Sequence, residues 1–128
     1  MEAGEIAVEL IVARIDEAQL AELEEGGDES VREPLEGARS RREQMTARLA
    51  EASADEGVDP LPYAWDYLQR RTQFLEDEVR ALRQQHEATE ARTAERREAN
   101  TRLQEARRIL KHTKKLAEDP MFDQVRDA

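Results

Sequence analysis

Two histidines, His86 and His112, are the side chains in this chain best suited to acid–base or metal chemistry. His86 stands four residues before Glu90, so on a helix the two side chains would share one face and supply half of a metal site. The Glu-x-x-His pairing of di-iron bundles is absent, because Arg83 and Ile109 stand three residues before the histidines. We therefore interpret His86 as a polar seam residue, and we expect no metal and no cofactor.

A catalytic constellation is also missing from the sequence. The chain has no cysteine, which excludes thiol nucleophiles, disulfides and thiolate metal sites. It has no glycine-rich phosphate loop and no serine in a nucleophile elbow. A long helical hairpin would also offer no deep cleft from which water could be excluded. The sequence therefore predicts that this protein is not an enzyme.

A basic segment at residues 102–115 could contact phosphate groups. It lacks the interleaved aromatic residues that stack on bases, and the whole chain has a formal net charge of -10. Residues 1–30 are strongly acidic, so we interpret the basic segment as their electrostatic complement. We do not expect nucleic acid to be the partner, although a nucleic-acid-associated factor acting through these bases is kept as an alternative function.

Aromatic residues gather just after a proline-containing turn. Tyr63 and Tyr67 stand four residues apart, and Phe74 continues the same helical stripe. Arg70 and Arg71 flank it. Tyr, Phe and Arg on an exposed helix face are the residue types that protein interfaces use as anchors. We predict a docking face for a protein partner or a second copy; the alternative is that the first helix covers this face.

The end of the chain lies beyond its last proline and carries three apolar residues, Met121, Phe122 and Val125. Terminal segments are commonly poorly ordered unless they are tied down. We predict a flexible tail at 119–128, with these three residues as candidate anchors for a partner.

Helices must position all of these residues. Charged residues make up 39% of the chain and aromatic residues 4%, a composition typical of coiled coils. Glycines at 26, 27 and 57 and prolines at 60, 62 and 120 divide the chain. They predict helices over about 4–24, 31–54 and 60–118, in a single domain that covers residues 1–118.

A leucine seam predicts how these helices pair. Its members are Leu35, Leu49, Trp65, Leu68, Leu75, Leu82, Leu103 and Leu110. An antiparallel register would match Leu35 with Leu82, Ala52 with Trp65, and, further along, Ile11 with Ala106. The expected fold is all-α, a long antiparallel helical hairpin with a broken first arm. The alternative is a three-helix bundle from which the C-terminal helix projects.

The first helix is apolar almost all round between Ile6 and Ile15, and such a helix is buried on more than one side. A two-helix hairpin cannot cover it, which predicts an oligomer or a protein partner.

The sequence contains no membrane-spanning run and no secretory signal, so we expect a soluble intracellular, cytoplasmic protein. The predicted function is a non-enzymatic coiled-coil scaffold, adaptor or stalk subunit of a larger assembly. A chaperone that holds a partner helix is a further alternative.

Overall fold

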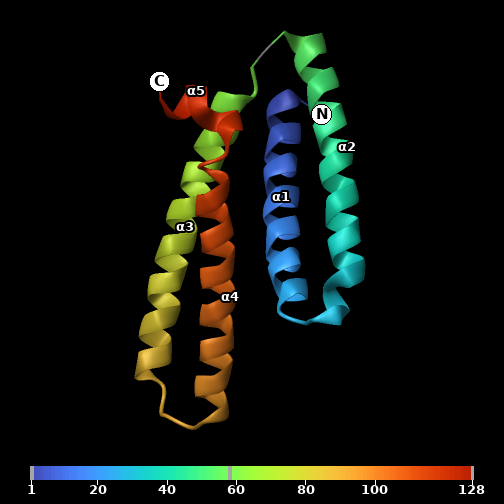
Figure 1. Cartoon of the computed structure of the whole chain (residues 1–128). Coiled ribbons are helices and arrows are strands. Elements are labelled where there is room, and N and C mark those ends of the chain that lie inside the picture. Colours follow the sequence, from blue (N-terminus) through green and yellow to red (C-terminus); the bar gives the residue numbers. More distant parts are fainter. Residues whose placement is uncertain (1, 58, 128) are drawn as a thin grey trace.

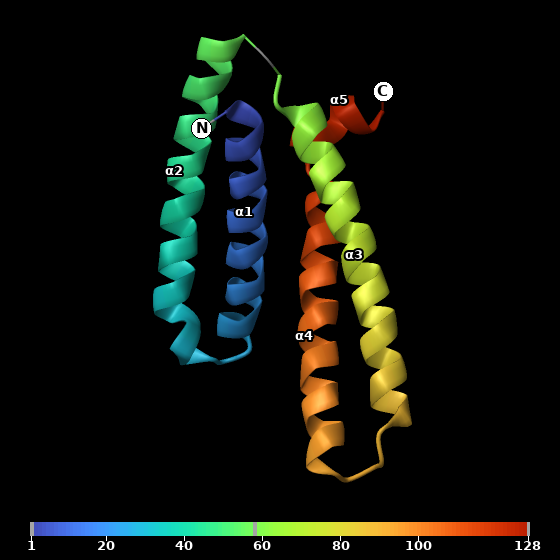
Figure 2. The same cartoon turned by 180° about the vertical axis from the view of Figure 1, so that it is seen from behind.

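The computed structural model describes residues 2–57 and 59–127, and these residues form an all-α fold, as the sequence predicts. Two antiparallel helical hairpins lie side by side (Figures 1 and 2). The elements in chain order are α1 (Ala3–Glu25), η1 (Glu29–Val31), α2 (Arg32–Glu56), α3 (Leu61–Ala88), α4 (Ala94–Leu116), η2 (Pro120–Phe122) and α5 (Asp123–Arg126). The first hairpin joins α1 and α2, and the second joins α3 and α4.

The glycine and proline breaks lie where the sequence places them. Gly27 and Gly57 have φ angles of 99° and 64°, which only glycine adopts at little cost, and they follow the ends of α1 and α2. Before α3, the Asp59 carboxylate accepts a hydrogen bond from the Leu61 N–H at 3.0 Å. The glycines end the helices, and Asp59 accepts from a backbone N–H group at the start of α3. The first two turns could therefore be predicted from local chemistry.

The prediction of one continuous helix over 60–118 is wrong. The chain leaves the helix after Ala88, turns, and begins α4 at Ala94 (Figure 1). The physical reason lies in the sequence between Leu82 and Leu103, which contains no large apolar residue. A helix through this stretch would have no packing partner. When the chain folds back instead, α3 and α4 bury each other's apolar faces.

The turn between α3 and α4 is built from polar side chains. The Thr93 hydroxyl accepts a hydrogen bond from the Arg96 N–H at 3.1 Å, which caps the start of α4. The Arg96 guanidinium donates to the Thr89 carbonyl at 2.9 Å, which satisfies a group beyond the end of α3. Arg92 takes a left-handed φ of 66°, a backbone conformation that residues other than glycine seldom adopt. These contacts replace the helical hydrogen bonds that the chain gives up here.

The predicted pairing of α2 with α3 is also wrong. α2 packs along α1, and α3 packs along α4. Leu82 joins a cluster with Leu103 and Ala106 of α4, so it does not meet Leu35. Ile11 belongs to a different cluster from Ala106. Because α4 occupies the face of α3 that was assigned to α2, both the long hairpin and the three-helix alternative are excluded for the described residues.

Helix α1 is the central element of the core. Ile6 and Leu10 pack against Met45 of α2. On its other side, Ile11 belongs to a cluster with Leu68 of α3 and with residues of α4 and the tail. A single chain therefore covers α1 on two sides. The expectation that α1 needs an oligomer or a partner for its burial is wrong, because the α3/α4 hairpin covers its second side.

The C-terminal tail packs onto the helices, in contrast to the flexible tail that the sequence suggested. Phe122 is fully buried, and its ring centroid lies 5.3 Å from that of Trp65 at an angle of 47°. Met121 is partly buried against the same cluster, and Val125 is half-buried. The apolar residues of the tail thus complete the core at one end of the hairpins.

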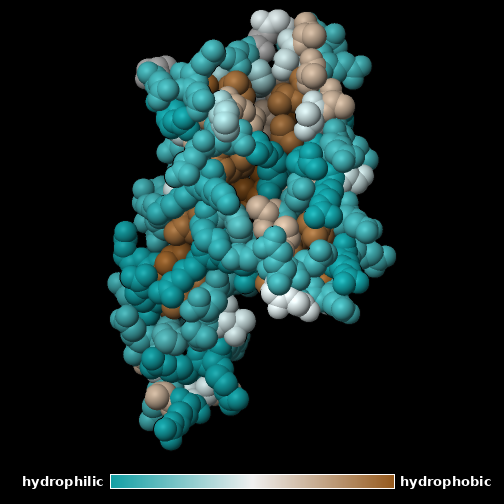
Figure 3. Space-filling view, in the orientation of Figure 1, coloured by the Kyte–Doolittle hydropathy of each residue, from teal (hydrophilic) through white to brown (hydrophobic). Residues whose placement is uncertain are grey.

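Hydrophilic residues cover most of the face in Figure 3, and apolar residues are visible mainly in narrow strips between helices. Among residues 2–57 and 59–127, no helix combines the length and apolar character needed to cross a bilayer.

Candidate functional site

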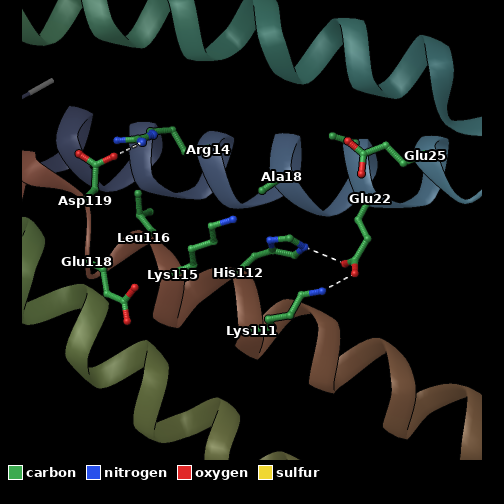
Figure 4. Close-up of a pocket in the computed structure, with 11 residues that line it drawn as sticks. Arg14, Ala18, Glu22, Glu25, Lys111, His112, Lys115, Leu116, Glu118 and Asp119 are labelled. Atoms are coloured by element: carbon green, nitrogen blue, oxygen red, sulfur yellow. Dashed lines mark hydrogen bonds and ion pairs between the residues drawn. The ribbon is translucent and has the colours of Figure 1, made fainter.

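A crevice of about 820 Å³ lies between α1 and α4 (Figure 4). Helix α1 contributes Arg14 and Glu22, α4 contributes Lys111 and His112, and Asp119 lies just beyond α4. α1 and α4 run in opposite directions (Figure 1), and Glu22, near the end of α1, lies beside Lys111 and His112 of α4. The crevice is therefore a candidate site for a charged ligand, provided that its charges are free.

At one end of the crevice, Arg14 binds the tail. Its Nη2 lies 2.5 Å from Oδ2 of Asp119, and its Nη1 lies 3.0 Å from the sulfur of Met121. The hydrogen bond from Arg14 lowers the pKa of Asp119 below its ordinary value. This pair fixes the tail on α1 and leaves neither charge unpaired.

At the other end, Glu22 bridges two side chains of α4. Its carboxylate binds Lys111 Nζ and lies 2.7 Å from His112 Nε2. Its hydrogen bonds lower the pKa of Glu22, and the bond to Lys111 has a larger effect than the bond to His112. The His112 side chain is only 11% exposed, and its Nδ1 is buried without a hydrogen-bond partner in the described chain.

The side chains of the crevice hold the two hairpins together. The ion pairs of Arg14 with Asp119 and of Glu22 with Lys111 join α1 to the tail and to α4, and Glu25, Lys115 and Glu118 also line the crevice. Within the described residues, no group of three or more His, Asp and Glu side chains could hold a metal ion. His86 lies at the end of α3, where its carbonyl accepts from the Thr89 N–H at 3.3 Å. Since α3 ends at Ala88, Glu90 lies in the turn, so the predicted shared helix face for His86 and Glu90 is wrong.

The predicted docking residues lie along one side of α3, and we call them the α3 stripe: Tyr63, Tyr67, Arg70, Arg71 and Phe74. Tyr63 is 54% exposed and Phe74 is 56% exposed, which makes them two of the three exposed large apolar side chains among the described residues. The Arg71 guanidinium lies 5.2 Å from the centroid of the Phe74 ring, within cation–π distance. Arg70 pairs with Asp66 at 2.9 Å and is itself well exposed.

The two tyrosines at the start of the α3 stripe also contact α1. Tyr67 is half-buried and packs against the core cluster that contains Ile11. The ring of Tyr63 covers Gly4, where a Cβ atom would come within 2.9 Å of the tyrosine Cδ1. The alternative, in which α1 covers this face, thus holds in part for the tyrosines but not for Phe74.

All eight seam residues are buried or half-buried, although they are shared between two hairpins instead of one. Leu35 and Leu49 lie on α2; Trp65, Leu68, Leu75 and Leu82 lie on α3; Leu103 and Leu110 lie on α4. Leucine spacing therefore identified the buried positions, but it did not identify their neighbours.

The basic segment at 102–115 complements acidic residues only in part. Lys111 binds Glu22 of α1, and Lys114 lies 3.1 Å from Glu76 of α3. Two acids of α1, Glu9 and Glu17, instead pair with arginines of α2, as in the 2.5 Å contact between Glu17 and Arg42. The predicted attraction between the ends of the chain is thus real at Glu22, whereas α2 supplies the counter-charges of Glu9 and Glu17.

Neither the helix cap at Thr93 nor the burial of Phe122 was predicted from the sequence, and only the first of these has a signal there. The Thr93 cap of α4 was readable, because a threonine before an Ala-Glu pair is a common helix start. The role of Phe122 was not, because a short apolar segment after a proline is equally compatible with a free tail. Comparison of the chain with protein-family models, curated proteins and solved structures found no match.

Proposed function

We propose that this chain is a non-enzymatic helical scaffold or adaptor subunit of a larger protein assembly, and that the α3 stripe is its docking face. The observation that carries the proposal is the exposure of Tyr63 and Phe74 beside Arg70 and Arg71. Exposed aromatic and arginine side chains in a cluster are enriched among the residues that dominate binding energy.

The internal packing of the other apolar faces supports this choice. Helix α1 packs on both hairpins, and Phe122 fills the gap beside Trp65. Besides the α3 stripe, the described residues expose only Val12 among their large apolar side chains. A partner that uses apolar contacts is therefore best accommodated on α3.

The crevice between α1 and α4 supports a structural role more than a catalytic one. Arg14, Glu22, Lys111 and Asp119 are engaged in ion pairs that connect elements of the fold. A general acid or base would need a free position next to a substrate. We accordingly assign these residues to the stability of the fold and not to chemistry.

Site-specific photo-crosslinking in the native cells tests the docking face. A photoreactive phenylalanine analogue at position 74 should form cross-links to protein, and the same analogue at Arg48, an exposed position on α2, should not. Additional Arg70→Glu and Arg71→Glu substitutions should reduce the cross-links at 74. Equal cross-linking at 74 and 48, or none at 74, contradicts the proposal.

A further inference from the structure

We infer that the α3 stripe binds a second copy of this chain, with the two α3 helices antiparallel and Phe74 packed on Phe74 at the two-fold axis. The inference rests on the proposed docking role of this face and specifies its occupant. It is carried by the order of charges on α3 and by the exposure of the residues concerned.

The charges around Phe74 are arranged with opposite signs on its two sides. Arg70 and Arg71 precede Phe74 by four and three residues, and Asp77 and Glu78 follow it by three and four. All five positions lie on one side of a helix, because residues three and four apart are neighbours on its surface. Arg71 is half-buried, and the other four are exposed. This side of α3 is thus basic before Phe74 and acidic after it.

A two-fold axis at Phe74 converts this order into attraction. In an antiparallel pair, each residue faces one about equally far from the centre in the opposite direction. Arg70 then meets Asp77 of the second copy, and Arg71 meets Glu78 of the second copy. Each contact occurs twice by symmetry. The apolar centre of the stripe is therefore flanked by opposite charges on both sides.

The next turns of α3 continue the same match. Asp66 would lie near Arg80 of the second copy, and Tyr67 would lie over Ala81, which is small and exposed. Within one chain, Arg70 pairs with Asp66 and Arg80 pairs with Asp77 at 3.4 Å. Because these intrahelical pairs are exposed, they hold little energy and can extend into a network across the interface.

Other registers of the same two helices are unfavourable. A two-fold axis one turn earlier, near Arg70 and Arg71, would bring arginines together. An axis one turn later, near Asp77 and Glu78, would bring carboxylates together. A parallel arrangement would keep Phe74 on Phe74 but would place Arg70 beside Arg70. Like charges in contact disfavour each of these pairings, so the sequence of α3 selects one orientation and one register.

The position of α3 in the fold leaves room for such a contact. In both views α3, apart from its first turns beside α5, forms the edge of the molecule that is farthest from α2 (Figures 1 and 2). The contact extends over the 15 residues from Tyr67 to Ala81, about 22 Å of helix. One helix pair of this length lies at the small end of interface sizes, so we expect a dissociation constant on the order of tens of micromolar.

Sedimentation velocity over a concentration series of the full-length protein tests the dimer. The wild-type chain should change from monomer to dimer as its concentration rises, and Phe74→Ala should weaken the association by about 30-fold or more, as expected for an interface anchor. Val12→Ala is the matched control, because Val12 is the one exposed large apolar residue outside α3 among residues 2–57 and 59–127. It should leave the association unchanged.

Charge reversal tests whether these charges hold the two copies together. A chain with Arg70→Glu and Arg71→Glu faces its own Asp77 and Glu78 in a homodimer, so it should be monomeric. A chain with Asp77→Arg and Glu78→Arg faces its own arginines and should also be monomeric. An equimolar mixture restores every opposite pair and should form a heterodimer with about wild-type affinity. Circular dichroism of each chain checks that the fold is intact.

The outcomes separate this inference from the proposed function. A wild-type chain that stays monomeric at several hundred micromolar overturns the dimer, as does a dimer that is unaffected by Phe74→Ala or a mixture that fails to associate. Cross-links from position 74 to a different protein would then retain the docking role and assign the stripe to that partner. Cross-links from position 74 to the chain itself, together with the restored heterodimer, support the inference.

Discussion

Phe122 gives the sharpest test of the fold, because the sequence places it in a tail and the structure places it in the core. Its side chain is fully buried, and its ring lies 5.3 Å from that of Trp65. Phe122→Ala would remove a whole ring from between α3 and the end of α4. The matched control is Phe74→Ala, which removes the same ring from an exposed position of α3.

The expected magnitude follows from burial. Truncation of a buried phenylalanine to alanine costs about 3–5 kcal/mol, because apolar contacts are lost and a cavity remains. Exposed substitutions are usually within about 0.5 kcal/mol of neutral. For a chain of this size, we expect Phe122→Ala to lower Tm by roughly 10–20 °C and Phe74→Ala to change it by only a few degrees. Phe122→Leu, which retains most of the volume, should cost less than about 1.5 kcal/mol.

Thermal and urea unfolding, followed by circular dichroism at about one micromolar protein, would measure these differences. The low concentration matters because self-association through Phe74 would otherwise stabilise the wild-type chain. The fluorescence of Trp65, the chain's one tryptophan, should also change in Phe122→Ala and not in Phe74→Ala. If both alanine variants cost the same small free energy, the tail is not part of the core and the packing of Phe122 is refuted.

Four further predictions concern the turn, the ion pairs and the carboxylate of Asp16. Spin labels at Glu76 and Lys114 should lie within about 20 Å, whereas a continuous helix would separate them by about 57 Å. Thr93→Ala should cost about 1 kcal/mol in urea unfolding through loss of the helix cap, and an unchanged midpoint would argue against the turn. The pKa of Glu22 is lowered, so its stabilising contribution is present above its ordinary pKa of 4.5 and is lost as pH falls through the lower folded value. Glu22→Gln should thus lower Tm at pH 7 and have no effect near pH 2. Burial, the larger influence, raises the pKa of Asp16 above 3.8 although Arg41 opposes it, so the ionised carboxylate opposes folding once the pH exceeds that value. Asp16→Asn should raise Tm at pH 7 but not near pH 3, and an equal effect at both would contradict burial as the cause.

The sequence predicted the elements of this fold better than their partners. Gly27, Gly57 and Asp59 act within a few residues of themselves, so the first two turns were readable from local chemistry. The leucine spacing identified which residues are buried, because one helix face carries them. Spacing cannot say which helix covers that face. The face of α3 that includes Leu82 fits α2 and α4 equally well by pattern, and α4 covers it in the structure.

The turn at 89–93 decided the topology, and its signal was weak. It contains no glycine or proline, and Arg92 takes a left-handed backbone conformation without either. The stronger signal was negative, since a long stretch around the turn offers no large apolar residue for packing. Once the chain folds back there, α3 and α4 bury each other. The α3/α4 hairpin then covers the second face of α1, which the sequence had assigned to an oligomer.

This internal covering of α1 narrows where an assembly could form. If α1 needed a partner, binding and folding would be one event, and no substitution could separate them. With α1 buried in the single chain, Phe74 remains exposed while Phe122 is fully buried. Folding and docking should therefore be separable at these two residues. The tyrosines lie between the two cases, because Tyr67 packs on the core and Tyr63 covers Gly4. Substitutions there should affect stability and association together, so Phe74 is the position at which the docking role is best tested.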